Sequence, residues 1–219
     1  MQATNTSLAG WRSVVGCVVA VACAVMLAKS ELAAAKTATC LPDVALTDAH
    51  GKPFTPASLR GKVVLVSFIH SSCPEMCDLV VDKFAQVAKK LGPELGSKVA
   101  LLSVSNDPQS DHPEQLLAMA RKHHADLNGW VFATGSSKAV AELLRCYGLS
   151  LKREANGEPE HIAQIFLVDP DGRQVRQYWG VVVRAQKVVA DINRLLRRAE
   201  RSGYPATASR IEPRVSSER

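Results

Sequence analysis

Short apolar runs alternate along the chain with segments whose apolar residues recur at helical spacing. Runs rich in Val, Leu and Ile, bounded by turn residues, are typical of buried strands, whereas a spacing of three or four residues indicates one buried helix face. The pattern predicts strands at 63–68, at 99–104 and near 131–133. It predicts helices over 75–90, 113–124 and 136–147. Such alternation favours a parallel sheet with helices on its faces.

The last part of the chain departs from this alternation. Two more strands, Ile165–Val168 and Gln174–Tyr178, are joined by Asp169-Pro170-Asp171-Gly172, whose residues favour a hairpin turn. A final helix is predicted over Ala185–Ala199. The predicted fold class is therefore α/β: a thioredoxin-like central sheet flanked by helices, with a C-terminal β-hairpin and helix.

The pattern of the first 39 residues indicates an export segment. Arg12 precedes an uncharged stretch, Ser13–Ala28, about as long as the apolar core of a secretory signal and shorter than the roughly 20 residues that span a bilayer comfortably. The small residues Ala33-Ala34-Ala35 suit cleavage. Residues 1–39 are therefore predicted to be a signal peptide or an N-terminal membrane anchor, which places the protein in the periplasm or another extracytoplasmic compartment.

The rest of the chain suits one domain. About 180 residues remain after the export segment, enough for a single hydrophobic core. Residues 40–200 carry all the predicted elements, whereas 201–219 lack apolar periodicity and are predicted to be disordered. The net charge of +6 is spread along the chain without aromatic clusters, so no nucleic-acid partner is expected.

Candidate chemistry is concentrated at Cys73 and Cys77, which stand at the turn from the first predicted strand into the first helix. Pro74 suits the first helical turn, so Cys73 should lie at the helix entrance and Cys77 about one turn further in. Two sulfurs at this spacing can bind one soft metal ion or close a disulfide. The helix N-terminus favours thiolate over thiol. A purely structural bridge is disfavoured, because a loop this short constrains the unfolded chain little.

Four sequence stretches, taken in order, resemble the SCO/SenC family of copper-binding, thioredoxin-like proteins from about Leu41 to Leu196. The first is Cys73-Pro74-Glu75-Met76-Cys77, which matches the family's C-P-x-x-C. The others are 103–114, close to S-V-D-P-x-x-D-T-P-E; Gly129-Trp130 with Thr134-Gly135; and Glu160-His161 ahead of Leu167-Val168-Asp169-Pro170-Asp171-Gly172. The chain departs from the family at Asp78, His112 and Ile162, where Pro, Thr and Ser are usual.

The resemblance implies that Cys73, Cys77 and His161 bind one copper ion, as Cu(I) or Cu(II). It also implies a client, the copper-bearing subunit of apo cytochrome c oxidase with its dinuclear copper centre. The chemistry agrees, because thiolates select Cu(I) and imidazole accepts either oxidation state. Zinc is the competing metal, but a fourth strong ligand is not evident from the sequence. A hydrogen-bond acceptor should orient His161 by binding its other ring nitrogen.

A thiol-disulfide oxidoreductase is the alternative function. In it one cysteine of the pair attacks a partner's disulfide and the other resolves the mixed disulfide. The oxidoreductase function gives His161 no role, and the cysteines are separated by three residues, one more than is typical of dithiol oxidoreductases. Since copper binds only the reduced pair, either function needs a thiol reductant, and the copper-binding function also needs a copper donor.

Several other residues have two interpretations each. His70 and Met76 could lend secondary copper contacts, or they could cap the strand and pack in the helix. Asp111, three residues before Glu114, has capping-box spacing, and His123 with His124 is predicted to be a solvated pair at a helix end. Cys40 and Cys146 could form a long-range disulfide in an oxidising compartment, although Cys146 could equally be a buried thiol.

Overall fold

The structure, a computed structural model, describes residues 39–73, 75–155 and 157–202. The predictions for the export segment and the C-terminal tail concern residues that lie outside this part, apart from Thr39, Arg201 and Ser202. The expected placement of Pro74 in the first helical turn lies outside it too. No helix within the described residues combines the length and apolarity needed to cross a membrane.

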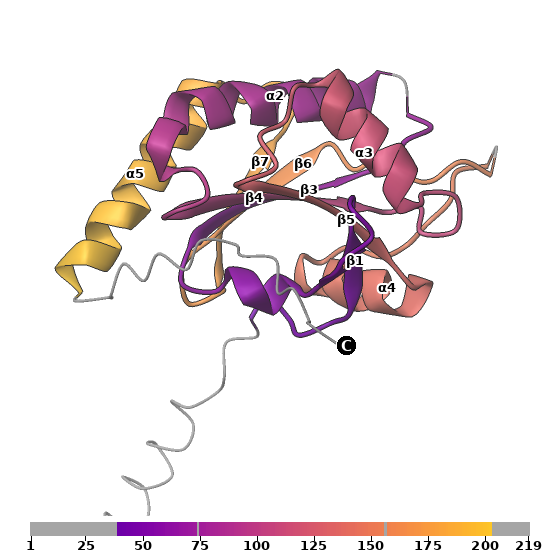
Figure 1. Cartoon of the computed structure of the whole chain (residues 1–219), viewed down its shortest axis with the longest axis horizontal. Helices are drawn as coiled ribbons and strands as arrows, with labels where there is room; N and C mark the ends of the chain where they lie inside the picture. Colours follow the sequence, from indigo (N-terminus) through magenta and orange to yellow (C-terminus); the bar gives the residue numbers. More distant parts are fainter. Residues whose placement is uncertain (1–38, 74, 156, 203–219) are drawn as a thin grey trace, which may run out of the picture. The chain divides into compact units, whose positions relative to one another are not determined.

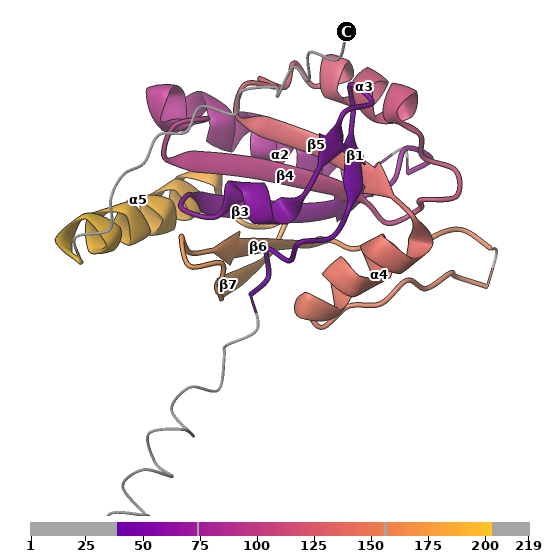
Figure 2. The same ribbon diagram turned by 60° about the horizontal axis from the view of Figure 1, so that its bottom comes forward.

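A single mixed sheet of seven strands forms the centre of the domain (Figures 1 and 2), in the order β2-β1-β5-β4-β3-β6-β7. The three strands predicted first are β3 (Val63–Ile69), β4 (Val99–Ser105) and β5 (Trp130–Gly135). The C-terminal hairpin is formed by β6 (Gln164–Val168) and β7 (Gln174–Trp179). The edge beyond β5 is completed by β1 (Leu46–Asp48) and β2 (Pro53–Phe54).

Within the described residues, four α-helices cover the two faces of this sheet. Figure 1 shows α2 (Met76–Leu91), α3 (Pro113–Lys122) and α5 (Ala185–Arg201) on one face, and α4 (Ser137–Cys146) on the other. Two 3-10 helices, η1 (Pro56–Leu59) and η2 (Gly92–Glu94), complete the fold. The predicted α/β, thioredoxin-like class with a C-terminal hairpin and helix is confirmed.

Each face of the sheet has its own hydrophobic core, because alternate strand residues point to opposite sides. Under α2, α3 and α5 the core includes Phe84 and Trp130, whose ring centroids lie 5.6 Å apart. On the α4 side Phe68 packs edge-on to Tyr147 at 5.3 Å. All seven residues of β3 and of β4 are buried, so these central strands form a rigid platform from which the following loops project.

The direction of the strands decides which loops meet. The parallel prediction is confirmed for β3, β4 and β5, but β6 runs antiparallel to β3 with Ser67 opposite Ile165. The end of β3 therefore lies beside the start of β6. Extending the register beyond the paired residues brings position 161 opposite position 71, so the loop before β6 reaches the turn that carries Cys73.

Sequence reasoning missed the shortest elements. The strands β1 and β2 have three and two residues, too few for alternation of apolar and polar side chains to be recognised. They form because β1 pairs with the exposed edge of β5, a contact between distant parts of the chain. Element type is correct for every segment that was predicted, and bounds differ by at most two residues.

Candidate metal centre

The two cysteines of the candidate site lie where β3 gives way to α2. Cys73 follows a tight turn in which its N–H donates to the carbonyl of His70 at 3.3 Å. Cys77 is the second residue of α2, and its N–H donates to Sγ of Cys73 at 3.2 Å. The predicted placement at the strand-to-helix junction is confirmed, but Cys77 lies in the first turn of α2 and not one turn further in, because the helix begins only at Met76.

Both thiols are buried, Cys73 to 2% and Cys77 to 4% relative exposure. The Sγ of Cys77 faces the end of β3, where it accepts a weak hydrogen bond from the N–H of His70 at 3.5 Å. Burial raises the pKa of Cys77 well above its ordinary value, and the neighbouring Cys73 thiol raises it further. Cys77 is therefore a neutral thiol in the metal-free protein, so a metal that binds it must displace its proton.

His161 comes to the site from the loop before β6. Its Nδ1 lies 2.9 Å from Oε1 of Glu154, which leaves Nε2 as the nitrogen that can bind a ligand. The hydrogen bond from His161 lowers the pKa of Glu154. Glu154 is therefore the hydrogen-bond acceptor that was expected for the other ring nitrogen of His161 but that the sequence did not identify. No spacing in the sequence pairs these residues, because their contact depends on how the loop folds.

His70 lies on the inner side of the same site, 1% exposed. Its Nδ1 is 2.9 Å from Oγ of Ser72, and its ring centroid is 5.0 Å from that of His161. Burial lowers the pKa of His70, and the neighbouring His161 lowers it further, so the imidazole is neutral near pH 7. Neutral imidazole is the form that binds metal.

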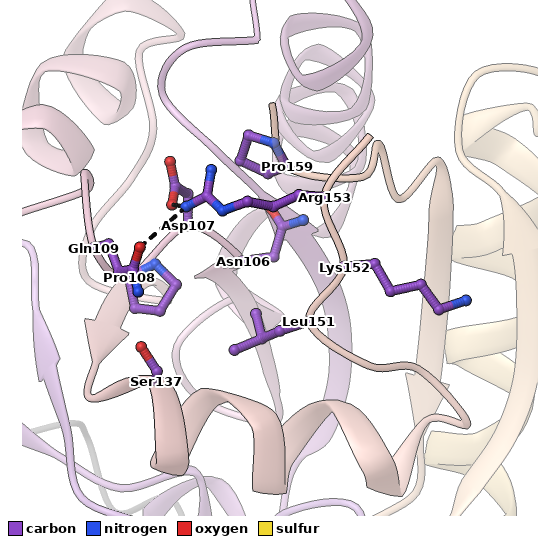
Figure 3. Close-up of a pocket in the computed structure, with 9 residues that line it drawn as sticks. All are labelled: Asn106, Asp107, Pro108, Gln109, Ser137, Leu151, Lys152, Arg153 and Pro159. Atoms are coloured by element: carbon purple, nitrogen blue, oxygen red, sulfur yellow. Dashed lines mark hydrogen bonds and ion pairs between the residues drawn. The ribbon is translucent and has the colours of Figure 1, made fainter. Parts of the chain in front are cut away.

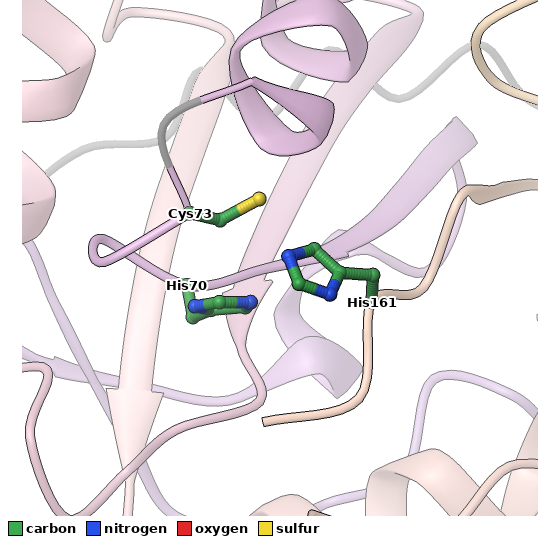
Figure 4. A group of neighbouring side chains, drawn as sticks. All are labelled: His70, Cys73 and His161. Atoms are coloured by element: carbon green, nitrogen blue, oxygen red, sulfur yellow. The ribbon is translucent and has the colours of Figure 1, made fainter. Parts of the chain in front are cut away.

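Figure 4 shows the side chains of His70, Cys73 and His161 directed toward one another. One potential ligand atom from each lies within 4.8 Å of the other two. Of the predicted set, the structure therefore brings Cys73 and His161 together and adds His70. Cys77 is outside this group and lies next to Cys73. Met76 is half-buried and packs against the apolar core, which agrees with its packing interpretation.

The loop that carries His161 is fastened to the end of β4. The buried amide of Asn106 donates through Nδ2 to the carbonyl of Glu160 at 2.8 Å. The guanidinium of Arg153 lies 2.8 Å from Oδ1 of Asp107. Asn106, Asp107 and Arg153 line a pocket, shown in Figure 3, that lies between the β4–α3 turn, the start of α4 and the loop before β6. Both contacts hold the loop that carries His161 against the end of β4.

Asp111 has a different role from the one its spacing predicted. The N-cap of α3 is His112, whose N–H donates to Oε1 of Gln115, so the assignment of Asp111 to a capping box is wrong. Asp111 is instead buried and accepts hydrogen bonds from the N–H and hydroxyl of Ser71 and from the hydroxyl of Ser105. It therefore ties the turn before Cys73 to the end of β4.

The interpretation of His123 as solvated is also wrong. Its side chain is 5% exposed and joins the two helices, with Nε2 2.9 Å from Asp78 and Nδ1 2.7 Å from Asp82. The α3 helix ends at Lys122, and His124 adopts a positive φ of 51°. A buried imidazole between two carboxylates was not visible in the sequence, because α2 and α3 meet only in the folded chain.

Cys40 and Cys146 lie side by side, although neither is in a disulfide in this structure. The Sγ of Cys40 contacts the carbonyl of Cys146 at 3.0 Å, and Sγ of Cys146 contacts the carbonyl of Thr39 at 2.9 Å. The proximity that a bridge requires is present, whereas the bridge itself stays a prediction.

The fold, with thiol and imidazole donors at one end of its central strands, places this chain in the class of thioredoxin-like proteins with a cysteine and histidine site. The model of the SCO1/SenC family matches residues 33–197. The chain therefore belongs to the SCO1/SenC family, as the sequence motifs predicted.

Individual relatives agree with this assignment. The SCO1 homologue of Bacillus subtilis is 32% identical over 134 residues, which are 60% of this chain and 69% of that protein. The solved structure of BsSco, described as a member of the Sco family of cytochrome c oxidase assembly proteins with a disulfide switch, has a TM-score of 0.61 at 28% identity and covers 70% of this chain and 91% of its own. Copper-bound ScoI of Bradyrhizobium japonicum has a TM-score of 0.61 at 26% identity, covering 69% and 96%.

The alignment spans only part of some curated relatives. It covers 65% of a putative copper-binding protein of Stutzerimonas stutzeri, at 25% identity, and 44% of mitochondrial SCO2 of Saccharomyces cerevisiae, at 28% identity. The activities and partners of those whole proteins therefore apply to this chain only as a proposal.

Proposed function

We propose that this protein binds copper and delivers it to the dinuclear copper centre of cytochrome c oxidase in a periplasmic or other extracytoplasmic compartment. The observation that carries the proposal is the approach of His161 to Cys73, two residues far apart in the sequence whose ligand atoms lie within 4.8 Å. A thiol and an imidazole from separate loops, each held by hydrogen bonds, form a pre-organised soft-metal site.

Cys73, Cys77 and His161 are the proposed ligands. The two thiolates select Cu(I), and the imidazole adds a donor that suits both oxidation states. Because burial keeps Cys77 protonated, copper binding releases a proton, and the affinity should rise with pH. Glu154 keeps the Nε2 of His161 available by holding Nδ1.

Delivery requires that copper can leave. Three protein donors leave room for a ligand from the receiving protein, so copper can pass by exchange of one ligand at a time. We assign three partners to this cycle: a copper donor, a thiol reductant that keeps Cys73 and Cys77 reduced, and the apo oxidase subunit that bears the copper centre. Support comes from the copper-bound ScoI structure and from the oxidase-assembly role stated for the family of BsSco.

Thiol-disulfide exchange at Cys73 and Cys77 is the second candidate. It is favoured by the proximity of the two residues, with the N–H of Cys77 3.2 Å from Sγ of Cys73, and by the disulfide switch stated for BsSco. Against it, both thiols are buried, and the raised pKa of Cys77 lowers its reactivity as a nucleophile. A partner disulfide could reach them only after the surrounding loops moved.

The test is titration of the reduced full chain with Cu(I) against a competing chelator. We expect about one copper per chain, and a loss of affinity in His161→Ala that exceeds the roughly 10–100-fold typical of outer-shell changes. His50→Ala, at an exposed site in the β1–β2 turn, serves as control and should bind like the wild type. The loaded protein should then transfer copper to the reduced apo copper-bearing subunit, which is followed by the absorbance of the dinuclear centre.

Two results would argue against copper delivery. Unchanged Cu(I) affinity in His161→Ala, together with rapid reduction of a partner's disulfide by the wild type, would favour the oxidoreductase. Tight binding without transfer to the apo subunit would leave a copper-binding protein with a different client.

A further inference from the structure

We infer that His70 is a further ligand of this site, which binds through Nε2 and completes a set of two thiolates and two imidazoles suited to Cu(II). The inference rests on the proposed function, because it concerns the same copper ion. It adds a residue outside the predicted set of Cys73, Cys77 and His161, and it specifies which oxidation state gains from that residue.

The first observation is the unpartnered nitrogen of His70. Among the described residues, only two buried side-chain atoms lack a hydrogen-bond partner, and Nε2 of His70 is one of them. A polar atom that is buried without a partner is unfavourable, so native proteins rarely keep one without a reason. A bound metal ion would satisfy this nitrogen.

The second observation is that His70 is oriented. Its Nδ1 is 2.9 Å from Oγ of Ser72, a contact that holds the ring while leaving Nε2 directed away. A histidine that binds a metal usually has its other nitrogen held in this way, and His161 shows the same arrangement with Glu154. Both imidazoles of the site are therefore oriented through Nδ1, His70 by a hydroxyl and His161 by a carboxylate.

The third observation is distance. Donors bound to one ion at about 2.0–2.3 Å in tetrahedral or trigonal geometry lie about 3.3–4.0 Å apart. The ligand atoms of His70, Cys73 and His161 already lie within 4.8 Å of one another, so contraction by a small amount brings them onto a common ion. His70 approaches from the protein interior and His161 from the solvent side, so together they flank Cys73 (Figure 4).

The donor types indicate which ion benefits. Cu(I) is satisfied by soft thiolates, whereas nitrogen donors contribute more to Cu(II), which prefers a larger and harder ligand set. A fourth donor from His70 should therefore raise the affinity for Cu(II) more than that for Cu(I). A four-ligand set of this kind also suits Zn(II), so zinc becomes a stronger competitor than a three-ligand site would allow.

The test uses the reduced full chain and the variant His70→Phe, which keeps a flat buried ring and removes both nitrogens. Cu(II) is added below one equivalent and the sample is frozen at once. Electron spin-echo measurements with ¹⁵N-labelled histidine then count the bound imidazoles. We expect two in the wild type and one in His70→Phe, with Cu(II) affinity reduced about 10–100-fold and Cu(I) affinity changed less than about threefold. His50→Phe is the control and should match the wild type.

A measurement without thiol oxidation supports the count. Co(II) does not oxidise thiols as Cu(II) does, and its visible bands are intense in a four-coordinate tetrahedral site. These bands should weaken in His70→Phe, while the urea midpoint of the metal-free variant stays equal or rises, because an unpartnered buried nitrogen has been removed.

The two proposals fail in distinguishable ways. If His70→Phe keeps two bound imidazoles and the wild-type Cu(II) affinity, His70 is not a ligand, while copper binding by Cys73, Cys77 and His161 still stands. If the wild type binds no copper in either oxidation state, the proposed function fails, and the role of His70 fails with it.

Discussion

The imidazole of His161 is held by the carboxylate of Glu154, with Nδ1 and Oε1 2.9 Å apart. Both side chains lie toward solvent, with 35% and 44% exposure. The contact therefore contributes little to stability but fixes which ring nitrogen of His161 faces Cys73.

Replacing Glu154 should weaken copper binding without unfolding the protein. We expect Glu154→Ala to lower Cu(I) affinity by about tenfold, at the low end of outer-shell effects because the carboxylate is partly exposed. Glu154→Gln keeps an acceptor oxygen and should lose much less. Chelator competition measures both, and equal losses in the two variants would show that charge, not orientation, is what matters.

Loss of the Asn106 amide should loosen the loop that carries His161. In Asn106→Ala the carbonyl of Glu160 loses its donor, so we expect faster amide exchange over 152–160 and a Cu(I) affinity lower by about threefold to tenfold, which corresponds to one hydrogen bond. Ser137 lines the same pocket from the start of α4, and Ser137→Ala serves as control. Unaltered exchange in Asn106→Ala would mean that the contact of Arg153 with Asp107 holds the loop alone.

Oxidation should join Cys40 to Cys146. With oxidised glutathione, the two thiols pass two electrons and two protons to the reagent, which leaves as two reduced glutathione molecules, and one protein disulfide forms. The bond of Tyr147 to the carbonyl of Cys40 already holds the two segments together. Closing a loop across 106 positions should raise the free energy of unfolding by about 3–5 kcal/mol.

Peptide mass spectrometry in the Cys73→Ser, Cys77→Ser background identifies this bridge, because the other described pair is then absent. Cys146→Ser in the same background should show neither the bridge nor the gain in stability. If Cys40 and Cys146 stay free thiols after treatment with oxidised glutathione, the prediction is contradicted.

Acid should weaken the docking of α5 through Asp191. Burial alone would raise the pKa of this carboxyl, but hydrogen bonds from Lys187 and Tyr178 and nearby cations lower it below its ordinary value of 3.8. Since the pKa is lower in the folded state, the carboxylate contributes its full stabilisation above that ordinary value. The contribution is lost as the pH falls toward the folded-state pKa.

Urea unfolding between pH 6 and pH 2.5 measures this effect. At pH 6, Asp191→Asn should be less stable than the wild type by about 1.5–3 kcal/mol, the scale of hydrogen bonds to a charged group. The difference should shrink below about pH 4, as protonation removes the same charge from the wild type. A constant difference over the whole range would show that Asp191 acts through packing alone.

The long elements of the fold were predictable from local sequence. Val63–Ile69 and Val99–Ser105 are mostly apolar runs, and the helices show one buried face each, so their type follows from the sequence pattern. The same locality limits the prediction. The short strand Leu46–Asp48 forms only by pairing with Trp130–Gly135, and the direction of Gln164–Val168 is set by its neighbour and not by its own residues.

The candidate site divides in the same way. The spacing of Cys73 and Cys77 and the motif around His161, which resembles that of a known family, allowed these three positions to be predicted from the sequence. Asp111 and His123 were misassigned, since a carboxylate near a helix start and a histidine near a helix end usually face water. Here the packing of α2, α3 and the end of β4 buries both.

The amino-acid sequence by itself determined the α/β class, the family and the pair of cysteines, because each is written in residues close together along the chain. Only the tertiary structure decided that the imidazole of His70, whose Nε2 has no partner, lies beside Cys73 and His161. It also decided that Glu154 holds the His161 ring and that Asn106 holds the loop that carries it. The physical reason is the antiparallel register of β3 and β6. Hydrogen bonding between those strands brings together loops that no local pattern connects.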